Sequence, residues 1–72
     1  MTDLVAHSEA LRRLRSMARK KNAFVLCTPG GKAKDRYAIV DNETGTTITS
    51  VHAHHRKLHE VDLEVVRERL GV

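Results

Sequence analysis

The fold is decided by residues 36–51, which read RYAIVDNETGTTITSV. The two ends of this stretch are rich in Tyr, Ile, Val and Thr, whose branched or flat side chains fit a pleated surface. The centre, Asp41 to Gly45, has the composition of a turn, because Asp and Asn side chains bond nearby backbone amides and glycine tolerates a positive φ. The stretch therefore predicts a β-hairpin closed by a type I turn and a glycine bulge.

A further strand is predicted before this hairpin. Residues 23–28 form a short apolar run, and the following Pro29-Gly30-Gly31 interrupts it. The motif resembles a phosphate-binding loop only superficially, because its first glycine is missing and Lys32 is followed by Ala33. We expect a flexible connection there, in a three-stranded antiparallel sheet with one face covered by helices. The Thr-rich third strand, residues 46–51, is expected to be an exposed edge.

Two helices are predicted around the sheet. Residues 2–22 carry apolar side chains at helical spacing, and Thr2 or Ser8 could cap the start. Residues 62–70 form the second helix, with Asp62 as N-cap and Gly71 just past the end. Val61 and Val66 have the spacing of a hydrophobic staple. The expected buried positions are Leu4, Leu11, Leu14, Met17 and Ala18 in the first helix and Leu63, Val66 and Leu70 in the second.

The predicted architecture is thus α+β, in the order α-β-β-β-α, in a single domain of residues 1–72. A chain of this length buries about 60% of its unfolded surface, so its core is small and a homodimer is a reasonable expectation. The formal net charge is +4, which permits nucleic-acid or acidic protein partners without requiring them. Phe24 and Tyr37 are the only aromatic residues, too few for a platform that stacks single-stranded bases.

The first helix is expected to carry a strongly basic outer face. Its cations lie opposite the apolar stripe, and only Glu9 offsets them. This face could dock phosphates or an acidic surface, or it could simply be solvated. The candidate binding residues are Arg12, Arg13, Arg15, Arg19 and Lys20, helped by Lys32, Lys34, Arg56 and Lys57 from the loops.

Four of the five histidines fall between residues 52 and 59, at positions 52, 54, 55 and 59. Imidazole is the commonest metal ligand. On a strand His52 and His54 share a face, and on a helix His55 and His59 do, but neither arrangement supplies three ligands. We therefore expect no metal and no cofactor. The alternatives are a solvated connector and a tract whose protonation near pH 6.5 makes the protein more basic.

The single cysteine, Cys27, excludes an internal disulfide and favours the cytoplasm. The N-terminus lacks the features of a secretory signal, and no apolar run approaches the roughly 20 residues that span a bilayer. Cys27 lies in an apolar run, where a thiol is expected to be buried and inert. No other nucleophile and base are paired in the sequence, so we expect no enzyme.

One further pattern combines a basic helix, a Tyr-x-x-Val-Asp hairpin and a closing Leu-x-x-Val helix, in residues 11–14, 18–20, 24–26, 37–41, 44, 63–66 and 70. It resembles the pattern of small uncharacterised proteins of actinobacteria and their phages. The histidine tract departs from it. The resemblance implies the fold and a phage or actinobacterial source, with the host cytoplasm as the location of a phage protein, and it brings no catalytic residues.

Two functions follow from these features. We favour a small non-enzymatic module that binds a host or partner protein, as a phage-type accessory protein, through a strand edge, the sheet face or the basic helix. The alternative is sequence-independent binding of DNA or RNA through the basic helix, because no motif that reads base sequence is present. No membrane partner is expected.

Overall fold

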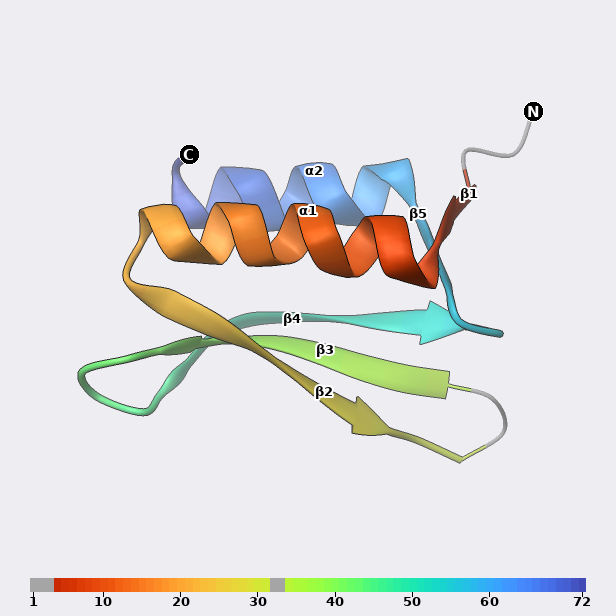
Figure 1. Cartoon of the computed structure of the whole chain (residues 1–72), viewed down its shortest axis with the longest axis horizontal. Coiled ribbons are helices and arrows are strands. Elements are labelled where there is room, and N and C mark those ends of the chain that lie inside the picture. The colour runs from red at the N-terminus through yellow and green to blue at the C-terminus, as the bar shows by residue number, and fades with distance from the viewer. Residues whose placement is uncertain (1–3, 32–33) are drawn as a thin grey trace.

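The computed structural model describes residues 4–31 and 34–72. It contains two helices and five strands (Figure 1). In chain order the elements are β1 (Leu4–Ala6), α1 (His7–Lys20), β2 (Ala23–Pro29), β3 (Lys34–Asp41), β4 (Thr47–His54), β5 (Lys57–His59) and α2 (Glu60–Leu70).

The predicted hairpin is confirmed as β3 and β4, which pair antiparallel with Tyr37 opposite Val51. Asp41 holds the turn, because its carboxylate accepts hydrogen bonds from the backbone N–H groups of Glu43 and Thr44 at 2.7 and 3.2 Å. Gly45 has a φ of 73°, the conformation for which glycine was expected. A bulge between Ile39 and Val40 shifts the register near the turn.

The prediction of three strands is wrong, because the antiparallel sheet has five, in the order β1-β5-β4-β3-β2. The first element of the described residues is β1 rather than a helix, and β1 pairs with β5 so that Val5 lies opposite Leu58. Each of these strands has three residues and buries a single apolar side chain, too short to show an alternating pattern. The tract expected to be a connector is therefore the end of β4, a turn and β5.

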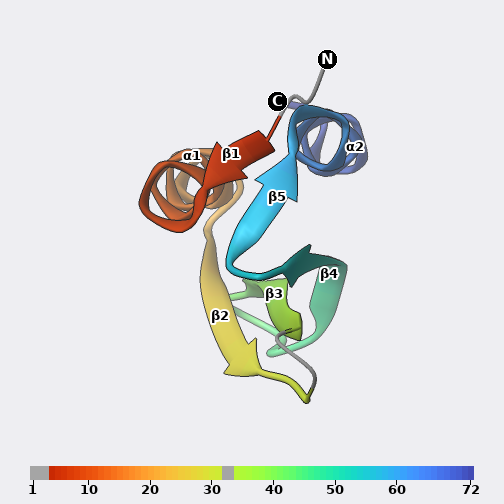
Figure 2. The same ribbon diagram turned by 90° about the vertical axis from the view of Figure 1, so that its right-hand side faces the viewer.

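The β1–β5 ribbon is attached to the rest of the sheet by one residue pair, His54 with Lys57. Figure 2 shows β5 running from the end of β4 up to the level of the helices, where β1 joins it. β4 thus lies inside the strand order and is not the edge strand that was expected. The edges are the short β1 and the seven-residue β2.

Both helices cover the same face of β2, β3 and β4, with α1 above β2 and α2 above β4 (Figures 1 and 2). The core lies between the helices and this inner face. Tyr37 and Ile39 of β3 are fully buried there, and Arg13 of α1 donates to Glu60 of α2 at 2.7 Å across the helix pair. The core side chains that were expected in the helices and are buried are Leu14, Ala18, Leu63, Val66 and Leu70.

The bounds of α1 differ from those predicted. The helix begins at His7, so Leu4 belongs to β1 and is 45% exposed. Ala6 is the N-cap, and Ser8 lies within the first turn; Thr2 falls outside the described residues. The helix ends at Lys20, two residues before the predicted end at Asn22. Asn22 has a φ of 53°, a left-handed conformation that asparagine tolerates.

α2 begins two residues earlier than predicted, at Glu60. Asp62 is therefore not the N-cap but the third helical residue, and its carboxylate accepts a 3.1 Å hydrogen bond from the backbone N–H of His59. Val61 falls in the first turn and is 64% exposed, so the predicted staple with Val66 is not formed. Gly71 ends the helix in a left-handed conformation, as expected.

Candidate functional site

β2 is the long open edge of the sheet, because β3 is its only partner strand among the described residues. Residues 23–29 contain no charged side chain. Proteins usually protect an edge strand by lysine or inward charges, by proline, by a bulge or by a very short length. β2 has seven residues and no charged side chain, and its one proline, Pro29, is the last of them. The edge before Pro29 is therefore available for pairing with another chain.

The backbone groups that face this open edge follow from the hydrogen-bond pattern. The N–H of Asn42 donates to the carbonyl of Asn22, while the N–H of Asp41 donates to Thr46 on the other side of β3. Because pairs alternate in an antiparallel ladder, even-numbered residues of β2 bond to β3 and odd-numbered ones face outward. The residues of β2 whose N–H and C=O groups both face outward are Ala23, Val25 and Cys27. Pro29, which lacks an N–H, also occupies an outward position, where proline is tolerated.

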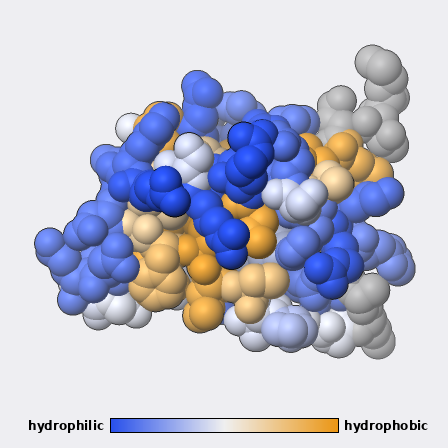
Figure 3. All heavy atoms as spheres, in the orientation of Figure 1, coloured by the Kyte–Doolittle hydropathy of each residue, from blue (hydrophilic) through white to orange (hydrophobic). Residues whose placement is uncertain are grey.

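The outer face of the sheet carries a small apolar cluster next to this edge. Phe24 and Leu26 are 43% and 50% exposed. Their partners in β3, Val40 and Ala38, lie beside them on the same face and are nearly buried. Ile48, at the bulge of β4, is 40% exposed. In Figure 3 the hydrophobic surface gathers over β2, below the charged side chains of α1. We define Phe24, Leu26, Ala38, Val40 and Ile48 as the apolar cluster.

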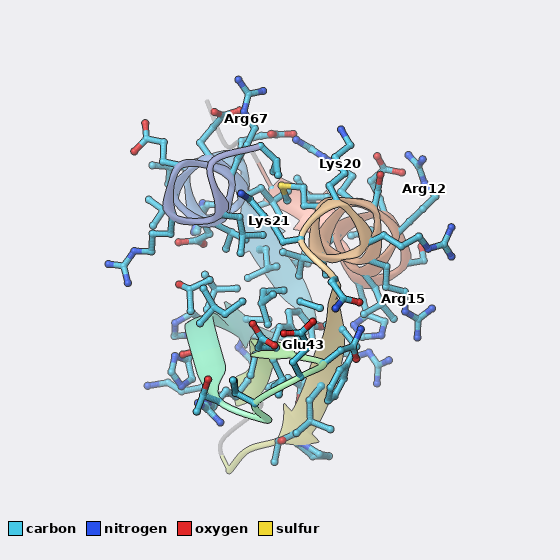
Figure 4. All side chains as sticks on the ribbon, turned by 90° about the vertical axis from the view of Figure 1, so that its left-hand side faces the viewer. Arg12, Arg15, Lys20, Lys21, Glu43 and Arg67 are labelled. Carbon is cyan, nitrogen blue, oxygen red and sulfur yellow. The ribbon has the colours of Figure 1, made fainter. Side chains whose placement is uncertain are left out.

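A basic flank runs along α1 on the side away from α2. Ser8, Arg12, Arg15 and Arg19 recur at spacings of four, three and four residues, so they share one side of the helix. With Ser16 they line a shallow depression of about 290 Å³. Figure 4 shows Arg12 and Arg15 extending away from α2, with Arg15 on the side of β2. Guanidinium groups and hydroxyls are donors suited to carboxylates and phosphates.

The cations of α1 are not equivalent. Arg12 forms a bidentate ion pair with Glu9 at 2.7 Å. Arg15, Arg19 and Lys20 form no ion pair with another described residue. These three side chains are thus available to an acidic ligand.

Arg13 does not belong to the basic flank, because it turns toward α2 and pairs with Glu60 at 2.7 Å. The hydrogen bond from Arg13 holds the pKa of the Glu60 carboxyl below its ordinary value. The same bond raises the pKa of Arg13. This predicted binding residue therefore joins the two helices instead.

The remaining predicted cations lie apart from the basic flank. Lys34 begins β3, Arg56 occupies the turn between β4 and β5, and Lys57 begins β5. These positions are at the end of the molecule opposite the C-terminus of α1 (Figure 1). Lys32 lies outside the described residues. The eight predicted cations that the structure describes thus do not form a single patch.

The four clustered histidines are all exposed and do not converge. His52 and His54 lie on the outer face of β4, His55 is in the turn, and His59 precedes α2. Within residues 4–31 and 34–72, no three His, Cys, Asp or Glu side chains are placed to hold a metal ion.

Cys27 is exposed, contrary to the expectation that it is buried, because β2 is an edge strand whose far end lies away from α1. Partial burial raises the pKa of its thiol, and the nearby carboxylate of Asp35 adds to the effect. A raised pKa keeps the sulfur protonated, which makes it a poor nucleophile. Tyr37 is buried in the core, and its hydroxyl bonds to Nδ1 of His7, a partner not visible in the sequence.

Sequence reasoning missed Ser8 and Ser16 in the basic flank, and it missed β2 as the edge. The spacing of Ser8 with the arginines was a usable signal. The edge could not be inferred, because it depends on the order of strands in space.

Comparisons of the chain with protein-family models, curated proteins and solved structures give no match. Neither helix in the described part of the chain has the length and apolar character needed to cross a bilayer.

Proposed function

We propose that this protein is a small non-enzymatic module that binds a partner protein by pairing an extended segment of it with the open edge of β2. The observation that supports this most is the absence of charge over the seven residues of that edge, beside half-exposed Phe24 and Leu26. Addition of a strand to an exposed edge is a recurrent mode of peptide recognition, in which backbone bonds give affinity and alternate side chains give specificity. An accessory role in an actinobacteriophage belongs to this proposal through the resemblance alone.

The test is a selection of random displayed peptides on the full chain, followed by mapping of the selected peptides by amide chemical shifts. Val25→Pro removes an N–H that faces outward and leaves the bonds to β3 intact, so peptide binding should be lost. The matched control is Val61→Pro, in the first turn of α2, where proline is tolerated and the side chain is 64% exposed. Circular dichroism of both variants establishes that they fold.

Peptide shifts centred on Val25 and Cys27, with loss in Val25→Pro only, would support the proposal. If no peptide is selected, or if the selected peptides bind folded Val25→Pro as they bind the original chain, the proposal is wrong.

The second candidate function is sequence-independent binding of DNA or RNA. It is favoured by the basic flank, where Arg15 and Arg19 have no acidic partner among the described residues and two serines line the same depression. Side chains of both kinds contact phosphate oxygens in nucleic-acid complexes.

A salt titration by fluorescence anisotropy tests this candidate, with generic duplex DNA and with RNA. Phosphate contacts release counterions, so log K should fall linearly with log salt, by about 0.9 per contact on duplex DNA. Changing Arg12, Arg15 and Arg19 to Ser should abolish binding. The absence of binding at low salt would exclude the candidate.

A further inference from the structure

We infer that the segment which pairs with β2 alternates acidic and apolar residues, the acidic ones facing α1. This inference rests on the proposed function, because it assumes that β2 is the binding edge. It adds the kinds of side chain that the partner segment carries. The outer and inner faces of the sheet beside β2 favour different kinds.

The period of a strand fixes which surface each partner residue meets. Residues that lie opposite Val25 and Cys27 in an added strand have side chains on the inner face, the face covered by the helices. Residues that alternate with them lie opposite Phe24 and Leu26, on the outer face. Two surfaces of different chemistry thus border the same edge.

On the outer face, the neighbours of the added strand are apolar. Phe24 and Leu26 keep about half of their surface exposed and stand beside nearly buried Val40 and Ala38. Covering apolar surface makes the free energy of binding more favourable by about 25 cal/mol for each Å² removed from water. A valine, leucine or isoleucine on this side of the segment would extend the apolar cluster.

On the inner face, the neighbours include the basic flank of α1. α1 packs against β2, and Arg15 extends on the side of β2 without an ion pair in the described part of the chain (Figure 4). Arg19 lies one helical turn further along the same flank. A carboxylate on this side of the segment would meet unpaired guanidinium groups, whereas a lysine would be repelled.

The position of α1 also selects an extended segment over a second copy of this chain. Figure 2 shows α1 above β2 at the edge of the sheet. Two copies joined edge to edge in one sheet would carry both α1 helices on the same face, side by side above the joined strands. The axes of packed helices need 8–10 Å between them, about twice the spacing of adjacent strands. A segment without a helix has no such conflict.

The experiment uses three fluorescent peptides of about seven residues, the length of β2. The first alternates glutamate and valine, the second alternates lysine and valine, and the third has the composition of the first in two blocks. Their binding to the full chain is measured by anisotropy. We expect the alternating acidic peptide to bind at least about tenfold more tightly than the other two, since one close charge pair supplies that factor.

Two charge-reversal variants test whether Arg15 is the source of the preference for the acidic peptide. Arg15→Glu should remove the preference for the acidic peptide or reverse it. Arg67→Glu makes the same change of net charge on α2, where the side chain points away from β2, and should leave the preference unchanged (Figure 4). Equal effects of the two reversals would mean that net charge rather than position decides, and would overturn the inference.

A failure of this inference can be distinguished from a failure of the proposed function. If peptides bind at β2 without regard to charge or alternation, the inference is wrong and the proposed function stands. If no peptide of any pattern shifts the amides of Val25 and Cys27, both are wrong. If the acidic peptide binds in a way that Val25→Pro does not affect, it binds the basic flank alone, and the inference is wrong.

Discussion

The hydroxyl of Thr49 is buried on the inner face of β4, and no other described residue shares a hydrogen bond with it. A buried hydroxyl without a partner loses its bonds to water and gains none in return. Thr49→Val keeps the shape of the side chain and removes this cost. We expect it to raise the free energy of unfolding by about 1 kcal/mol, measured by urea denaturation.

The control for this substitution is Thr47→Val in the same strand, where the side chain is exposed. Its effect should lie within about 0.5 kcal/mol of zero. A destabilised Thr49→Val protein would mean that the hydroxyl has a bonding partner after all.

The phenol of Tyr37 provides a second prediction about a single residue. Burial raises its pKa, with smaller contributions from Cys27 and Asp35, against which Arg56 acts. Because the folded pKa lies above the unfolded value of about 10, the stabilisation is complete below pH 10 and is lost as the pH rises toward the folded pKa. The protein should therefore lose stability above about pH 10, and Tyr37→Phe should lose less.

The ionisation of Tyr37 can be measured directly, because the chain has one tyrosine and no tryptophan. The ultraviolet absorbance of the phenolate reports Tyr37 alone. A titration at the ordinary value, in a protein shown to be folded, would contradict it.

For single residues, the sequence predicted burial correctly where the spacing of apolar residues decides it. It placed Leu63, Val66 and Leu70 in a helical stripe, and all three are buried. It could not predict that His7 bonds to Tyr37, because thirty residues separate them and no local pattern records the contact. The exposure of Cys27 was missed for the same reason.

At the scale of elements, the turn between β4 and β5 carries backbone strain. His55 and Arg56 both have positive φ, at 50° and 62°, as a two-residue type I′ hairpin requires. A left-handed conformation costs most residues about 1–2 kcal/mol, and Asn and Gly much less. Changing His55 to Asn and Arg56 to Gly should stabilise the protein by about 1–2 kcal/mol in urea denaturation.

The reverse experiment checks the cause. Valine at position 55 should destabilise the protein, because a branched side chain is least compatible with a positive φ. If the Asn-Gly variant is not more stable, the turn is not strained in the way that these angles indicate.

This turn explains why sequence reasoning missed two strands. A type I′ hairpin is usually marked by Asn-Gly, and here the marker is absent. Residues 52–59 therefore looked like a polar connector, and β1 merged with the helical pattern after it. By contrast, the Asp41–Gly45 turn was predicted because it has the usual residues.

At the scale of the whole molecule, the pairing of β1 with β5 joins segments that are far apart in the sequence. Val5 and Leu58 lie opposite each other in β1 and β5, and both are buried. Val5→Ala and Leu58→Val should each cost about 1–2 kcal/mol. Because the side chains are register partners, the double variant should differ from the sum by about 0.5 kcal/mol or more.

The matched cycle combines Val5→Ala with Val66→Ala in α2, which has no register pairing with β1. These two should be closer to additive. Additivity of the first pair would mean that β1 and β5 do not act as one unit in solution. The expected homodimer stays a prediction that sedimentation equilibrium would check.

The β1–β5 ribbon also has a consequence for synthesis on the ribosome. Residues 4–6 are made early, but their partner strand is made only when synthesis reaches residues 57–59. Val5, which is buried in the finished fold, has no strand to pair with until then. A nascent chain that stalls before residue 57 therefore leaves an apolar strand open to chaperones and proteases.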